Sequence, residues 1–293
     1  MKSEALQAAL TAALGGKVAP LEDLLCRYGG GADPRPNLKL AAAFGAETPN
    51  LPPTVTRLLA RFSAEDAAPD TARVFLPIAA AHGWMGRLRA GLDVEQAWLS
   101  LAELAADERV PVRLGTLDAL NAFVLRKGGA DVLIGRAREW LDGEDRERSF
   151  GSAALVIETF ADRQALAAVG DARGVLDYLS RVLEAVASAP RSAERSDSRR
   201  RLLLALPRTL TAAVISFSAA DRGSLWLEEE CVKARHPDIR AVLSDSILKL
   251  RGQESPVVAQ RLRGALEGSA KPLRDPSRKR PGTDRGRASR KMK

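Results

Sequence analysis

The sequence predicts an all-α protein made of consecutive antiparallel helical hairpins, and two observations support this prediction. Aromatic residues make up only 4% of the 293 residues, whereas Ala, Leu, Arg and Glu, which lose little conformational entropy in a helix, are frequent. Short stretches of helical periodicity also alternate with brief turn signals, and connections this short place consecutive helices antiparallel. Strands are normally built from β-branched and aromatic residues, so a β-rich domain is excluded.

The N-terminal third is predicted to contain short helices separated by glycine and proline. Residues 1–16 have apolar side chains at helical spacing, and Glu4 and Gln7 interrupt them, which favours an amphipathic helix over a signal peptide. The glycines at 29–31 end the second helix, and Pro77 is expected to kink the last one. The helices are expected at 1–16, 21–28, 38–45, 54–62 and 71–91.

The middle of the chain shows the hairpin pattern most clearly. Gly128 and Gly129 are expected to end one helix through a positive φ angle, and Asp131 is expected to cap the next helix. Arg148 and the Arg199–Arg201 group are expected to lie at the start of further helices. The helices of this region are expected at 94–106, 110–126, 131–141 and 146–160.

Two segments of the sequence resemble each other. Arg109-Val-Pro-Val-Arg113 and Arg235-His-Pro-Asp-Ile-Arg240 each place a proline in the first turn of a helix and an arginine shortly after it. Proline suits the first turn because no N–H is needed there. The helix starts are spaced close to the period of about 40–47 residues that is typical of helical repeats. We expect Arg113 and Arg240 to bridge to an acidic group in the adjacent repeat.

These motifs also resemble a known repeat family. Pro111-Val112-Arg113 and Pro237-Asp238-Ile239-Arg240 are similar to the opening of the second helix in HEAT repeats, over a region of the chain that spans 68–266. The resemblance implies a right-handed α-solenoid with a concave binding face. The layout is also similar to that of the bacterial HEAT-like alkylpurine DNA glycosylases, although a shared fold does not establish a shared function.

The glycosylase resemblance implies a specific arrangement of side chains. That family is expected to hold a cationic alkylated base against a tryptophan, with a carboxylate one helical turn away. Trp226 with Glu230 and Trp140 with Glu144 have the required four-residue spacing. The family-like acid would be aspartate, whereas both acids here are glutamate. Tryptophans on a face rich in Ala and Leu also commonly belong to a core, so a structural interpretation remains beside the catalytic one.

The positive charge is distributed unevenly along the chain. The net charge is +8, and residues 269–293 account for all of it with ten basic and two acidic side chains. We therefore expect a helical domain over 1–268 and a disordered basic tail over 269–293, in which Arg278, Lys279 and Arg280 either attract nucleic acid or serve only solubility. The domain has one strong basic cluster that could follow a phosphate backbone. It consists of Arg191, Arg195, Arg199, Arg200, Arg201 and Arg208.

The remaining signals favour binding over catalysis. The sequence contains no phosphate-binding loop, and Cys231 and His236, five residues apart, would point about 140° apart on a helix, so no cofactor and no metal are expected. Two cysteines and the lack of a long apolar run predict a cytoplasmic protein with no membrane partner. We expect a non-enzymatic binding module for a protein partner. A nucleic-acid-binding protein of the DNA glycosylase type is the alternative.

Overall fold

The computed structural model describes residues 3–30, 36–253 and 256–269. Within these residues the regular elements are fifteen α-helices and four short 3₁₀ helices, with no strand. The prediction of an all-α protein is therefore confirmed. The expected tail at 269–293 lies outside the described residues except for Ser269, and the last helix ends at Gly268, where the helical domain was expected to end.

The N-terminal helices surround one almost completely buried helix. α5 (Phe75–Arg89) packs against α2, α3, α4, α6 and α7, and its side chains from Phe75 to Arg87 are buried. Trp84 and Phe75 are among the largest fully buried side chains of the protein. The helices that precede α5 are α1 (Ser3–Leu14), α2 (Ala19–Tyr28), α3 (Leu38–Glu47) and α4 (Pro53–Ala60).

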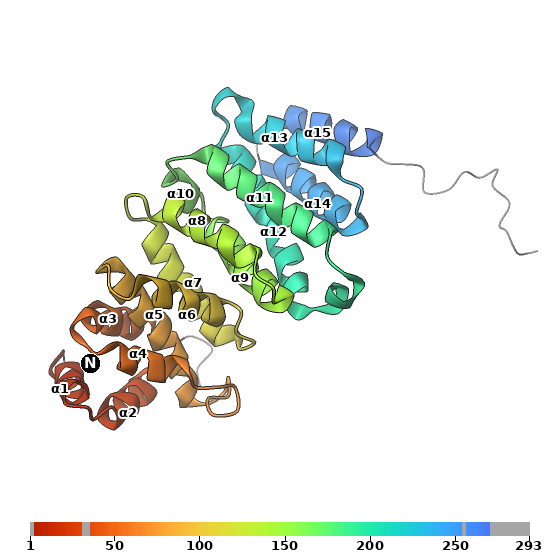
Figure 1. Cartoon of the computed structure of the whole chain (residues 1–293). Coiled ribbons are helices and arrows are strands. Elements are labelled where there is room, and N and C mark those ends of the chain that lie inside the picture. Colours follow the sequence, from red (N-terminus) through yellow and green to blue (C-terminus); the bar gives the residue numbers. More distant parts are fainter. Residues whose placement is uncertain (1–2, 31–35, 254–255, 270–293) are drawn as a thin grey trace, which may run out of the picture.

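After α5 the helices form two layers that follow the chain order (Figure 1). In one layer α8 packs against α11, α11 against α13, and α13 against α15. In the other layer α5 packs against α7, α7 against α9, α9 against α12, and α12 against α14. The first layer consists of α6 (Val94–Ala105), α8 (Gly129–Leu141), α11 (Ala172–Ala187), α13 (Arg222–Lys233) and α15 (Pro256–Gly268). The second layer continues from α5 with α7 (Val110–Val124), α9 (Arg146–Thr159), α12 (Asp197–Ser216) and α14 (Pro237–Gln253), and the short α10 (Arg163–Ala167) packs against α12.

Local sequence explains where these helices begin. The side chains of Asp145, Asp171 and Ser196 each accept a hydrogen bond from a free N–H of the first turn of α9, α11 and α12. Such caps satisfy N–H groups that have no partner within the helix. Pro111 and Pro237 lie in the first turns of α7 and α14, as the sequence predicts.

Two sequence expectations about helix boundaries are wrong. Residues 72–74 form a separate 3₁₀ turn, and α5 begins at Phe75. Pro77 therefore lies in the first turn of α5, where N–H groups have no partner within the helix, so its missing N–H gives no reason for the expected kink. Gly128 does adopt a positive φ of 75°, but α8 already begins at Gly129, so Asp131 lies inside its first turn. Its carboxylate instead accepts hydrogen bonds from the N–H groups of Gly170 and Asp171, just before α11.

Within the described residues, Arg113 and Arg240 also do not form the expected bridges to acidic side chains. Arg113 Nη1 donates to the carbonyl oxygens of Asp107 (2.7 Å) and Glu108 (2.6 Å). Arg240 donates to the carbonyl oxygen of Leu266 and to Ser269 Oγ, each at 2.8 Å. Carbonyl groups at loops and helix ends lack helical partners, so these arginines satisfy backbone acceptors where acidic side chains were expected.

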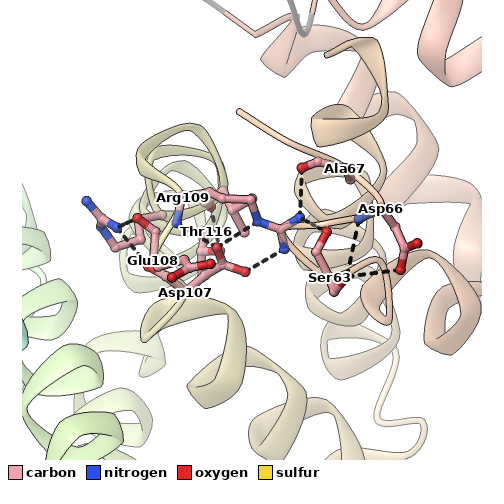
Figure 2. A network of polar contacts seen from close by, with 9 residues as sticks. Ser63, Asp66, Ala67, Asp107, Glu108, Arg109 and Thr116 are labelled. Carbon is pink, nitrogen blue, oxygen red and sulfur yellow. Dashed lines mark hydrogen bonds and ion pairs between the residues drawn. The ribbon is translucent and has the colours of Figure 1, made fainter. Parts of the chain in front are cut away.

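A different arginine holds the N-terminal part to the layered part (Figure 2). The side chain of Arg109 is 4% exposed and forms a two-pronged ion pair with Asp107 (Nε–Oδ1 2.9 Å, Nη2–Oδ2 2.7 Å). Its Nη1 also donates to the carbonyl oxygens of Ser63 (2.9 Å) and Ala67 (3.1 Å), in the loop between α4 and α5. One guanidinium group therefore connects the start of α7 to a loop more than 40 residues earlier.

Candidate functional site

The surface between α7 and α12 contains a groove with α9 at its base. α7 and α12 pack on α9, whose side chains from Ser149 to Ile157 are all buried. Two adjoining hollows of about 400 Å³ and 770 Å³ share Ala161 and Arg208. We call them together the α7–α12 groove. Its first hollow is lined by Leu117, Glu158, Ala161, Arg201, Leu204, Ala205 and Arg208, and its second by Ala161, Asp162, Arg163, Gln164, Arg208, Thr211, Ala212 and Lys249.

Exposed leucines lie on both walls of the groove. Leu204 on α12 is 75% exposed, and on α7 Leu117 is half-buried and Leu114, one turn before it, is 45% exposed. Single exposed leucines are common on protein surfaces. These leucines, however, lie on or beside a concave surface, where a partner could remove them from water.

The walls of the groove also carry positive charge. Burial lowers the pKa of Arg113 on α7, and the positive charge of Arg201 on α12 lowers it further. Glu158, at the end of α9, interacts with both arginines, and desolvation raises the pKa of its carboxyl group in spite of them. Arg208 and Lys249 add two further cations. The groove therefore combines apolar side chains with an excess of cations.

The basic cluster expected from the sequence is divided by the structure. Arg199 is 3% exposed and pairs with Asp238 of α14 at 2.8 Å, so it joins two helices and does not face solvent. Arg200 pairs with Asp197 on the surface, and Arg195 is exposed in the preceding 3₁₀ turn. Only Arg201 and Arg208, which are seven residues apart on α12, line the groove. The side chain of Arg191 and the tail residues Arg278, Lys279 and Arg280 lie outside the described part of the chain.

Trp226 and Glu230 are brought together, but through a third residue. Trp226 Nε1 donates to Ser180 Oγ at 2.8 Å, and Ser180 Oγ donates to Glu230 Oε1 at 3.0 Å. Lys233 Nζ pairs with the same carboxylate oxygen at 3.0 Å. This network joins α13 to α11 and lies beside a separate hollow of about 640 Å³, whose lining residues include Ser180 and Glu230. It is remote in the fold from the α7–α12 groove, since none of its residues lines either hollow of that groove.

Trp140 and Glu144 do not share a helix. α8 ends at Leu141, so Glu144 lies in the following loop and is exposed. The Trp140 ring packs edge to face against Trp98, with the ring centroids 5.9 Å apart, and Trp98 packs in the same way against Phe123. The four-residue spacing therefore does not place these two side chains one turn apart on a helix, and Trp140 is part of an aromatic cluster.

Sequence reasoning did not identify Leu204, Lys249 and Glu158 as groove residues. A signal for Leu204 was nonetheless available, because Arg201, Leu204 and Arg208 recur at the helical spacings i, i+3 and i+7. An apolar residue within a stripe of arginines is unusual for a purely solvated helix face. Lys249 and Glu158 belong to other helices, and their position beside α12 follows only from the packing.

No group of three or more His, Cys, Asp or Glu side chains in the described ranges could hold a metal ion. None of the described helices combines the length and apolar character required to cross a bilayer. Comparison with protein-family models, with curated protein sequences and with solved structures gives no match.

Proposed function

We propose that this protein is a non-enzymatic binding module that holds a protein partner in the α7–α12 groove. The observation that carries the proposal is the combination, in one groove, of Leu117 and the strongly exposed Leu204 with lining residues that contain more cations than carboxylates. Apolar contact supplies most of the free energy of protein association, and complementary charge adds specificity and speed. A rigid helical scaffold is well suited to present such a surface.

We also propose that the two layers form a right-handed HEAT-like solenoid. The layered packing supports this, because from α8 onward each helix packs against the corresponding helix of the next hairpin, and Trp98 of α6 contacts Trp140 of α8. Polar contacts also join successive hairpins: Asp142 contacts Arg181, which is 39 residues away in the chain, and Glu147 contacts Ser198, which is 51 residues away. Stacked hairpins of this kind bury a continuous core and leave an extended surface free for binding.

The composition of the groove favours protein over nucleic acid. Proteins that bind single strands stack bases on aromatic rings, and none of the described residues that line the two hollows is aromatic. Leucine offers no comparable stacking surface. The excess of cations supports nucleic acid as the second candidate, because arginine and lysine attract phosphate regardless of sequence.

A capture experiment with nuclease distinguishes the two candidates. The full chain, immobilised in a lysate of its source organism, is expected to retain a protein that survives nuclease treatment, and Leu204→Glu should reduce its recovery at least tenfold. Leu225→Glu is the matched control, because Leu225 is 50% exposed on α13 in the other layer. Far-UV circular dichroism confirms that both variants are folded. Recovery that disappears with nuclease, or that both variants reduce equally, would contradict the proposal.

The proposal also predicts that the chain lacks glycosylase activity. Lys233 and Ser180 already engage the Glu230 carboxylate, and the Trp226 indole donates to Ser180, so this pair is committed to joining α11 and α13. Incubation with alkylated duplex DNA is expected to release no methylated purine above the buffer blank, as measured by chromatography of the free bases. Release that Glu230→Gln abolishes in a folded protein would instead establish the glycosylase alternative.

A further inference from the structure

We propose that the occupant of the α7–α12 groove is an acidic amphipathic helix of the partner protein. This inference rests on the proposed function and specifies the chemistry of the partner. It is argued from the shape of the groove, from its charge and from the position of its leucines.

The shape of the groove suits a helix. The walls of its first hollow are two helices that flank a buried third, so this part of the groove follows the direction in which helices pack in this layer. Arg201, Leu204, Ala205 and Arg208 form a ridge at the spacings i, i+3, i+4 and i+7 on one wall, and Leu114 and Leu117 lie three residues apart on the other. Rows with these spacings are the ridges between which the side chains of another helix interdigitate.

The charge of the groove requires an acidic partner. The residues that line the two hollows include four cations, Arg163, Arg201, Arg208 and Lys249, and two carboxylates, Glu158 and Asp162. Arg208 and Lys249 continue the positive charge into the second hollow, where Asp162 is the one acidic residue among the described lining residues. Residues 1–268 as a whole carry equal numbers of acidic and basic side chains, so this excess is local. An acidic segment would complement this local excess of cations, whereas a basic segment would add to it.

The leucines require that the partner helix be amphipathic. Leu117, Leu204 and Ala205 line the first hollow, and Arg201 and Arg208 lie one turn to either side of Leu204 on α12. A helix that places apolar residues at i, i+3 or i+4, and i+7 against the leucines would direct its flanking Asp and Glu side chains towards the arginines. Charged pairs at such a rim form with little desolvation and add mainly to specificity and association rate.

A random 16-residue peptide library displayed on phage tests this inference on the full chain. The expected result is enrichment of sequences that combine Asp or Glu with apolar residues at helical spacing. A labelled synthetic peptide of the enriched sequence should gain helical circular dichroism when it binds. Its Kd, measured by fluorescence anisotropy, should rise at least tenfold in Arg208→Glu and in Leu204→Glu, and should also rise with salt concentration. Arg222→Glu, an exposed arginine on α13, should change the Kd less than twofold.

Three results would overturn the inference. The first is enrichment of basic, proline-rich or uncharged sequences, and the second is peptide binding that neither Arg208→Glu nor Leu204→Glu weakens. The third is displacement of the peptide by a 20-base-pair DNA duplex whose own binding requires Arg208, which would assign the groove to nucleic acid. If Arg208→Glu is not folded, Arg208→Gln replaces it. A native protein partner that requires Leu204 but binds through a neutral or extended segment would refute this inference and leave the proposed function intact.

Discussion

Replacement of Arg109 by alanine should lower the free energy of unfolding by about 3–5 kcal/mol, the usual cost of removing one member of a buried ion pair. The side chain of Arg109 is 4% exposed and that of Asp107 is 14% exposed, so neither group can recover its lost partner from bulk water. The substitution also removes the guanidinium donor from the carbonyl oxygens of Ser63 and Ala67, of which only that of Ser63 keeps another donor, the N–H of Ala67. The Asp107 carboxylate would keep only the backbone N–H of residue 109, and its lost countercharge and the lost carbonyl contacts together give this large effect.

Arg200→Ala is the matched control for this prediction. Arg200 also pairs with an aspartate, but its side chain is 68% exposed and that of Asp197 is 82% exposed, so its loss should cost less than about 1 kcal/mol. Arg109→Lys, which keeps the charge but cannot form the two-pronged contact, should lie between the two. Urea unfolding followed by circular dichroism measures all three. Equal stabilities of Arg109→Ala and Arg200→Ala would mean that the Arg109 network adds no stability.

The comparison of these two arginines shows what the sequence could and could not predict about the fold. The helices themselves follow from local signals, and the starts at Pro111 and Pro237 follow from the chemistry of the first turn. Arg109 and Arg200 look alike in the sequence, each within three residues of an aspartate. Their difference comes from backbone acceptors more than 40 residues away from Arg109, and such contacts leave no local pattern.

The candidate site shows the same division. The sequence identified Arg201 and Arg208 as members of a basic cluster. Arg199 lies two positions before Arg201, so the helical period places it on another side of α12. Which of these sides faces solvent follows only from the packing of α12 against α14. The spacing of Trp226 and Glu230 correctly placed them near each other, but Ser180, on α11, decides what they do. Which helices become neighbours is a property of the packing.

Gly86→Ala should destabilise the protein by about 3 kcal/mol, at the upper end of the usual cost of overpacking a core. A Cβ atom on Gly86 would overlap the carbonyl oxygen of Gly45 in α3 and lie 2.7 Å from Thr48 Oγ1. The obstruction is backbone, which cannot rotate away as a side chain can. Thr48 is held there by its own hydrogen bonds to the carbonyl oxygens of Gly45 and Gly83, each 2.8 Å long. The added methyl group can therefore be accommodated only if α3 and α5 move apart.

Gly135→Ala provides a control of opposite sign. Gly135 also lies inside a helix, α8, but a Cβ atom there would meet nothing within 4 Å. Alanine should therefore stabilise the protein by about 0.5–1 kcal/mol, because glycine loses more conformational entropy than alanine when a helix forms. Thermal and urea unfolding should place Gly86→Ala below the wild-type chain and Gly135→Ala above it. If both substitutions stabilised the protein, α3 and α5 would not approach as closely as described, and the burial of α5 beneath the N-terminal helices would need a different explanation.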